Sequence, residues 1–165
     1  MNNHLEIAIV AAGCFWGVQA YFDQVPGVVT TEVGYTGGHT KNPTYEQVCT
    51  HTTGHVEAVK ITFDPHRTTY RDLLRHFFRM HDPTQVNGQG PDIGDSYRSA
   101  VFYTTRSQQA AVTHLIQELQ PSFEEPIATE VAKASEFYLA ETYHQKYFEK
   151  TGRGECHIPY TQLEK

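Results

Sequence analysis

The chain has 165 residues, a formal net charge of −6 at pH 7 and a hydrophobic content of 39%. This length suits one domain, and the composition is that of a globular protein, which excludes a mainly disordered chain. The acidic balance argues against nucleic acid or an anionic membrane as a partner, because such binding draws chiefly on an excess of Lys and Arg.

The chain contains three cysteines, Cys14, Cys49 and Cys156. An odd and sparse set is not the disulfide framework of a small secreted domain, and it favours thiol chemistry in a reducing compartment or inert buried thiols. No apolar run reaches the roughly 18 residues of a membrane span. The apolar run 7–12, preceded by no Lys or Arg, is too short for a signal peptide. We therefore expect a cytoplasmic protein.

The first third of the chain predicts a strand, a helix, a second strand and a loop. Residues 5–12 are apolar and rich in β-branched side chains, which predicts a buried strand that Gly13 ends. Apolar residues then recur at steps of three and four, which predicts an amphipathic helix over 15–25. A second strand is predicted over 28–34. Residues 34–55, rich in Gly, Thr, His and Asn, are predicted to form a long loop.

The middle of the chain repeats this alternation. Residues 55–63 alternate between apolar and polar side chains and predict a third strand. A helix is predicted over 69–81, where Thr69 and the acidic residue three positions later resemble a capping box. A long loop follows over 82–96, and such loops inside compact domains usually serve function. A fourth strand is predicted over 97–103.

The last third predicts a helix that Ser107 caps and Pro121 ends, a strand over 127–131 and a final helix over 137–150. The core order is then β-α-β-β-α-β. This order predicts an α+β fold with a ferredoxin-like split β-α-β core, in which helices pack on one face of a mostly antiparallel sheet. We expect a single domain over residues 1–150 and a tail over 151–165.

Cys14 is the first candidate for chemistry, since it lies between a predicted strand and a predicted helix. Backbone N–H groups and the helix dipole favour an anion at that position, and the thiolate is the reactive form of cysteine. Two large aromatic residues, Phe15 and Trp16, follow it. The alternative is a small buried thiol in the core, which is the common fate of cysteine.

Glu57 is the second candidate. Side chains alternate along a strand, so Glu57 shares one face of the third strand with Val59, Ile61 and Phe63. A carboxyl group desolvated by such neighbours tends to keep its proton near neutral pH, and it then can donate a hydrogen bond or act as a general acid. The alternative is a strand end at which Glu57 reaches solvent.

Several short motifs together resemble the A-type peptide methionine sulfoxide reductases, in the order and spacing of that family over residues 7–150. They are Gly13-Cys14-Phe15-Trp16-Gly17, Gly34-Tyr35-Thr36-Gly37-Gly38, Asn42-Pro43-Thr44-Tyr45, Gly54-His55-Val56-Glu57-Ala58-Val59, His81-Asp82-Pro83-Thr84 and Tyr97-Arg98-Ser99. Enzymes of this kind restore oxidised methionine. The resemblance implies a catalytic domain that reduces the S epimer of methionine sulfoxide, protein-bound and free.

The resemblance also implies a role for each matching residue. Cys14 would attack the sulfoxide sulfur, and Phe15 and Trp16 would form the apolar wall around the S-methyl group. Glu57 would be the protonated acid that binds the sulfoxide oxygen.

Three further residues match the family at this site. Tyr45 and Tyr97 would donate hydroxyl hydrogen bonds to the sulfoxide oxygen, and Asp92 would orient its neighbours. No metal or other cofactor is implied, because aimed hydrogen-bond donors stabilise the developing charge.

Regeneration of the reduced enzyme would need a second thiol, which condenses with a sulfenic acid to give a disulfide. Cys156 is the candidate, although family members commonly carry Gly-Tyr-Cys where this chain has Gly154-Glu155-Cys156. The resemblance implies reduction of a Cys14–Cys156 disulfide by thioredoxin, with oxidised proteins and peptides as substrates. The alternative is a spare thiol at 156 and recycling by small thiols. We interpret Cys49 as structural and expect a monomer.

Two rival functions remain open at this point. Cys49, His51 and His55 have spacings that a zinc site uses, although no fourth ligand follows at an ordinary interval. A thiol-based redox sensor would need Cys14 and Cys156 but not Glu57.

Overall fold

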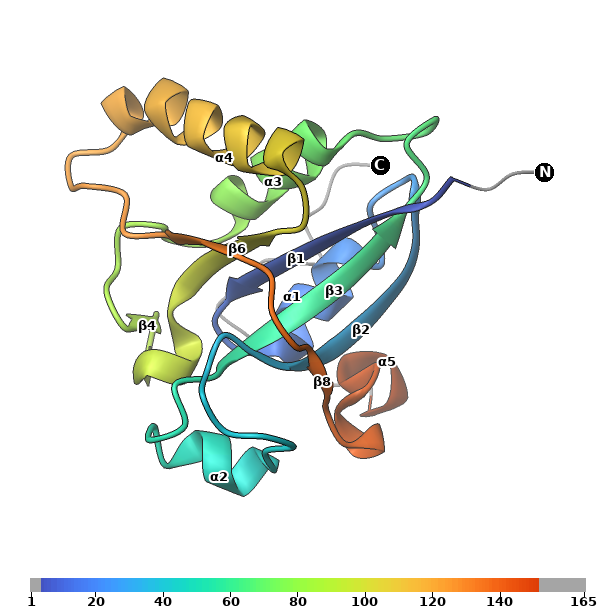
Figure 1. Ribbon diagram of the computed structural model, residues 1–165, viewed down its shortest axis with the longest axis vertical. Helices are drawn as coiled ribbons and strands as arrows, with labels where there is room; N and C mark the ends of the chain where they lie inside the picture. The colour runs from blue at the N-terminus through green and yellow to red at the C-terminus, as the bar shows by residue number, and fades with distance from the viewer. Residues whose placement is uncertain (1–3, 152–165) are drawn as a thin grey trace.

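The computed structural model describes residues 4–151 and contains a six-stranded sheet in the order β7-β6-β1-β3-β2-β8, beside a small β4-β5 hairpin (Figure 1). The strands are β1 (Glu6–Ala12), β2 (Val28–Thr36), β3 (Val56–Phe63), β4 (Gly88–Gln89), β5 (Asp92–Ile93), β6 (Ser99–Tyr103), β7 (Glu130–Lys133) and β8 (Tyr138–Leu139). The helices are α1 (Phe15–Phe22), α2 (Tyr45–Cys49), α3 (Tyr70–Met80), α4 (Arg106–Leu119) and α5 (Tyr147–Thr151), with short 3-10 turns at Asp95–Tyr97, Gln120–Ser122 and Thr142–His144.

The split β-α-β core predicted from the sequence is confirmed. Strands β1 and β2 are joined through α1, and both pair antiparallel with β3, which lies between them. β6 pairs antiparallel with the other edge of β1, and within residues 4–151 only β6 and β7 pair in parallel. The sheet is therefore mostly antiparallel, as expected.

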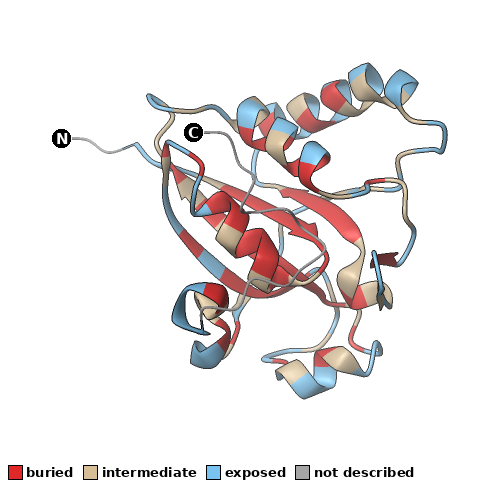
Figure 2. Ribbon diagram, turned by 180° about the vertical axis from the view of Figure 1, so that it is seen from behind, coloured by how far each residue is buried: buried red, intermediate tan, exposed pale blue. Residues whose placement is uncertain are grey.

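The helices α1, α3 and α4 cover one face of this sheet. Alternate side chains of β1, such as Ala8 and Val10, join the large apolar cluster on the helix side, whereas Ile9 and Ala11 join a smaller cluster on the opposite face. The chain from Ala132 to Phe137 crosses that opposite face and packs against the smaller cluster (Figure 1). Figure 2 shows α1 and the central strands as the most buried part of the molecule.

Helices α3 and α4 each begin at a threonine cap. Thr69 accepts a hydrogen bond from the N–H of Asp72 at the start of α3, as the capping pattern predicts. The expected cap of α4 is wrong, because Thr105 and not Ser107 accepts from the N–H of Gln108. Thr105 is extended and its hydroxyl reaches the free N–H groups of the first turn, whereas Ser107 already lies inside that turn.

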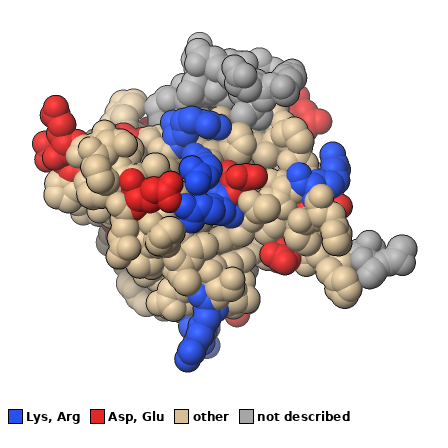
Figure 3. Space-filling view, turned by 90° about the horizontal axis from the view of Figure 1, so that it is seen from above, with Lys and Arg blue, Asp and Glu red and all other residues tan. Residues whose placement is uncertain are grey.

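Arginines of α3 join α3 to α4 on the surface. Arg71 and Arg75 both form ion pairs with Glu118 of α4, the second with 3.7 Å between nitrogen and oxygen. Figure 3, a view from above, shows basic side chains in a row with acidic ones beside it. Exposed pairs of this kind contribute about 1 kcal/mol or less, so they align the two helices more than they stabilise them.

The predicted loop over 34–55 is only partly a loop. β2 continues to Thr36, and the short helix α2 follows in the middle of the segment. A capping box begins α2, in which Thr44 and Gln47 each accept a hydrogen bond from the other's backbone N–H. The Thr-x-x-Gln pattern was the signal for this helix.

The predicted helix over 137–150 is wrong. The segment instead forms β8, a 3-10 turn and α5, and Lys146 adopts a left-handed backbone with φ of 58°. The open edge of β2 explains the difference, because β8 pairs with Gly34 and Tyr35 and satisfies their backbone groups. The expected strand over 127–131 lies slightly later, as β7.

None of the helices within residues 4–151 is long and apolar enough to cross a membrane. All but the first residue of the expected tail over 151–165 lies outside the described residues, and so does Cys156.

Candidate active site

Cys14 lies in the turn that joins the central strand β1 to α1. Gly13 makes this turn with φ of 93°, a left-handed conformation that glycine adopts without steric cost. Cys14 is then the N-cap of α1, is half-buried, and its carbonyl oxygen accepts from the N–H of Val18 at 3.5 Å. The strand-to-helix turn predicted around Cys14 is therefore confirmed, and its position favours negative charge.

Glu57 lies on β3, on the face covered by α1. Glu57 is only 2% exposed, and its Oε1 accepts a hydrogen bond from the N–H of Phe15 at 3.2 Å. Burial raises the pKa of Glu57 to about 8, the Phe15 hydrogen bond opposes this shift, and the charge of Asp92 adds to it. The prediction of a buried carboxyl is confirmed, a solvent-exposed strand end is excluded, and the raised pKa favours the protonated form near neutral pH.

Tyr45 and Tyr97 lie near this carboxyl, from two different segments. Tyr45 is the first residue of α2, and Tyr97 ends the 3-10 turn Asp95–Tyr97. Burial raises the pKa of both hydroxyls, and the charge of Glu57 raises both further. The charges of Asp92 and Cys14 also raise the pKa of Tyr97. Both phenols thus remain hydrogen-bond donors at any physiological pH.

Two further polar residues belong to this group. Asp92, on β5, acts through its charge on both Glu57 and Tyr97, which agrees with its predicted place at the site. Cys49 lies one helical turn after Tyr45, and the two side chains form a hydrogen bond that lowers the pKa of the Cys49 thiol while burial raises it more. The interpretation of Cys49 as structural did not anticipate that it adjoins the site.

Aromatic rings form a wall beside Cys14. Phe15 is buried, and the half-buried Trp16 stacks on Tyr147 with 3.8 Å between ring centroids. Trp16 Nε1 donates a hydrogen bond to Nδ1 of His144 at 2.9 Å. The His144 ring lies 5.1 Å from that of Phe15 and 4.5 Å from that of Tyr45, so it joins the wall to the tyrosine.

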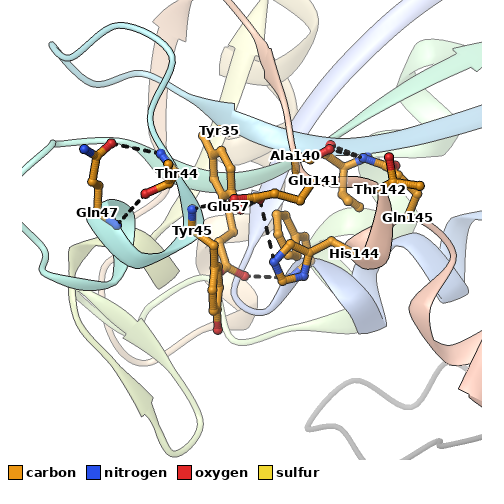
Figure 4. A network of polar contacts seen from close by, with 12 residues as sticks. Tyr35, Thr44, Tyr45, Gln47, Glu57, Ala140, Glu141, Thr142, His144 and Gln145 are labelled. Carbon is orange, nitrogen blue, oxygen red and sulfur yellow. Dashed lines mark hydrogen bonds and ion pairs between the residues drawn. The ribbon is translucent and has the colours of Figure 1, made fainter.

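Glu141 and His144 are site residues that the sequence analysis missed. Figure 4 shows Glu141 among Tyr35, Tyr45 and His144, with its carboxylate hydrogen-bonded to the first two. The prediction of a helix over 137–150 hid their role, because a helix there gave no reason to place either side chain near Tyr45 or Trp16. The sequence feature that could have indicated them is an acidic residue and a histidine among closely spaced aromatic residues.

The expected residues are therefore brought together, apart from Cys156, which lies outside the described residues. Within residues 4–151, no group of three or more His, Cys, Asp or Glu side chains is arranged to hold a metal ion. His55, one of the zinc candidates, instead accepts from the N–H of Gly38 and contacts the carbonyl oxygen of Thr40 at 2.8 Å.

Known proteins resemble this chain over most of its length. A family model described as peptide methionine sulfoxide reductase matches residues 6–165. A relative named peptide methionine sulfoxide reductase MsrA, from Methanosarcina acetivorans, is 55% identical over 150 residues, which cover 90% of this chain and 80% of the relative.

Solved structures agree with the sequence matches. Reduced Mxr1 from Saccharomyces cerevisiae is 33% identical, with a TM-score of 0.87 over 94% of this chain and 90% of that one. Mxr1 in complex with Trx2 shares the fold, with 23% identity and a TM-score of 0.63 over 89% of both chains. The chain thus belongs to the peptide methionine sulfoxide reductase family, whose members are oxidoreductases that reduce methionine sulfoxide.

Proposed function

We propose that the chain reduces the S epimer of methionine sulfoxide in oxidised proteins and peptides, and as the free amino acid, with Cys14 as nucleophile. The observation that carries this proposal is the buried Glu57 carboxyl, hydrogen-bonded to the backbone N–H immediately after Cys14. A nucleophilic thiol and a proton-bearing acid beside it are what reduction of a sulfoxide requires.

In the first step, the Cys14 sulfur attacks the sulfoxide sulfur and the S–O bond breaks. The oxygen passes to Cys14 as the transient bond between the two sulfur atoms breaks, so that the Cys14 thiolate, the sulfoxide and one proton become a sulfenic acid and a thioether. The substrate sulfur gains two electrons and Cys14 loses two. Glu57 donates its proton to the oxygen as negative charge grows there, from Oε2, because Oε1 already accepts from the N–H of Phe15.

The tyrosine hydroxyls support the same oxygen. Tyr97 and Tyr45 stay protonated and donate, and Tyr45 exchanges its hydrogen bond with Cys49 for one with the sulfoxide oxygen. Donors aimed at developing charge stabilise the transition state more than the ground state. Asp92 orients this group of donors.

The aromatic wall determines which epimer of methionine sulfoxide reacts. Phe15 and Trp16 offer an apolar surface that accepts the S-methyl group and leaves the oxygen to face Glu57. Exchange of methyl and oxygen would bury the oxygen against aromatic carbon with no donor, which costs free energy. Only the S epimer then reacts.

Thioredoxin completes the cycle. The sulfenic acid of Cys14 condenses with the thiol of Cys156, which forms a disulfide and releases water, and the thioredoxin dithiol reduces that disulfide. The solved complex of Mxr1 with Trx2 supports a reductant of this kind. We further propose that residues 1–150 form the single catalytic domain, that 151–165 deliver Cys156, and that the enzyme acts as a monomer without cofactor.

An epimer-resolved assay tests the proposal. Both epimers of methionine sulfoxide are supplied with a dithiol, and each is followed separately. We expect loss of the S epimer alone, with the R epimer as internal control, and no loss of either with Cys14→Ser. Disappearance of both epimers at equal rates, or an active Cys14→Ser variant, would contradict it.

In Cys156→Ser, one turnover should survive while thioredoxin-driven cycling is lost.

A further inference from the structure

The carboxylate of Glu141 joins three segments that are distant in sequence. Oε1 accepts a hydrogen bond from the hydroxyl of Tyr35 on β2 at 2.8 Å, and Oε2 accepts from the backbone N–H of Tyr45 at 2.9 Å. Oε1 also lies 3.8 Å from Nε2 of His144. One side chain therefore contacts the sheet, the start of α2 and the 3-10 turn that carries His144.

Glu141 is charged in this setting. Burial acts to raise its pKa, but the hydrogen bonds from the N–H of Tyr45, from its own N–H and from the Tyr35 hydroxyl, together with His144, hold the pKa of the carboxyl below its usual range. An ionised carboxylate accepts hydrogen bonds and donates none. Its three neighbours must accordingly present N–H or O–H groups to it.

This requirement and Trp16 together define the tautomer of His144. An indole N–H only donates, so Nδ1 of His144, which receives it, carries no proton. The neutral ring then carries its proton on Nε2, which is fully buried and has no hydrogen-bond partner within residues 4–151. Oε1 of the Glu141 carboxylate lies 3.8 Å from that nitrogen.

We infer that Glu141 is a positioning residue, which holds Trp16 through His144 and holds Tyr45 through its backbone N–H. The inference rests on the proposed function, in which Trp16 and Tyr45 contact the substrate. Glu141 fixes the orientation of His144, His144 fixes the indole, and the ring of His144 packs between that indole and Tyr45. Both sides of the substrate pocket therefore depend on one carboxylate.

Trp16 is the only tryptophan of the chain, so intrinsic fluorescence reports on this residue alone. In Glu141→Gln, the amide nitrogen faces an N–H where a carboxylate oxygen accepted one. We expect Trp16 emission to move to longer wavelength as the indole loosens. Misplacement of about an ångström costs up to about a hundredfold, so kcat/KM for a methionine sulfoxide peptide should fall about tenfold to a hundredfold, chiefly through KM.

Glu46→Gln is the matched control. Glu46 is exposed on the first turn of α2 and its charge also acts on His144, but its side chain forms none of the three contacts described above. If Glu46→Gln reproduces both changes, loss of charge alone explains them and the inference fails. Unchanged emission and kcat/KM in a folded Glu141→Gln variant overturn it equally.

Tyr35→Phe covers the case in which Glu141→Gln does not fold. This variant keeps the buried ring and removes only the hydroxyl that holds Glu141. We expect smaller changes in the same direction, and wild-type emission with wild-type KM would contradict the inference. The emission of the free protein needs no catalysis, so an inactive wild-type enzyme would count against the proposed function and not against this positioning role.

Discussion

The reacting half and the binding half of the candidate site are built by different means. Cys14 and Glu57 are brought together by the sheet itself, because β1 and β3 pair antiparallel with Val10 opposite Val59. The same register, continued, sets Glu57 across from Ala12, two residues before Cys14. Backbone hydrogen bonds of the central strands therefore place the thiol and the acid.

The binding half depends on side chains instead. Trp16 and Tyr45 are held by residues 140–146, and that segment is attached to β2 and α1 largely through glutamines. Gln145 accepts from the N–H of Val33 at 3.0 Å and donates to its carbonyl oxygen at 2.9 Å, as a neighbouring strand would. Gln19 accepts from the N–H of Lys146 at 2.7 Å. Single substitutions should thus alter binding far more easily than they alter the placement of Cys14 and Glu57.

The largest effect is expected in the reacting half, from Glu57→Gln. The amide keeps the shape of the side chain but supplies no proton to the departing oxygen. Loss of one aimed donor of this kind costs about a hundredfold to a thousandfold in kcat. Steady-state assays with the S epimer measure it. Normal turnover would favour a redox sensor, which needs the thiols and not this acid.

A moderate effect is expected in the binding half, from Gln145→Ala. The N–H of Val33 loses its partner, whereas the carbonyl oxygen keeps the hydrogen bond from the N–H of Ala140. An unsatisfied buried group costs about 1 to 3 kcal/mol. Chemical denaturation measures the loss, and KM should rise while kcat changes less. Gln24→Ala is the control, because the exposed Gln24 takes no part in the contact with Val33 and donates to the nearby carbonyl of Ala20. Equal losses of stability in both variants would argue against the strand-like role of Gln145.

The smallest effect is expected from Thr44→Ala, which removes the cap of α2. Loss of such a cap costs about 1 kcal/mol, and Tyr45 at the start of that helix should bind substrate slightly less well. The exposed Thr113, inside α4, gives the control Thr113→Ala. A variant of Thr44 as stable as Thr113→Ala, with unchanged KM, would show that the cap does not hold Tyr45.

The same contrast explains which parts of the molecule can be predicted from the sequence. The core strands, α1, α3 and the buried row that includes Glu57 follow from periodicity, because burial of one face forces alternation. The positions of Cys14 and Glu57 follow from those elements. Tyr45, Tyr97 and Asp92 were predicted as site residues from the family resemblance and not from a local pattern. They come from segments whose path depends on tertiary contacts.

The segment 137–150 was not predictable in the same way. Its apolar spacing suits a helix, but the free edge of β2 competes for its backbone and Gln145 substitutes for a strand residue. Long-range pairing of this kind overrides local propensity. His144 and Glu141 become visible only when that pairing is known.

The pH dependence of a single turnover tests the central claim most directly. Folding raises the pKa of Glu57 to about 8, so the carboxyl loses its proton as the pH rises through that value. Wild-type methionine formation should then fall about tenfold per pH unit above this point, whereas the slower Glu57→Gln variant should show no such fall. A wild-type rate that stays constant well above pH 8, or a Glu57→Gln variant with the same decline, would contradict the account.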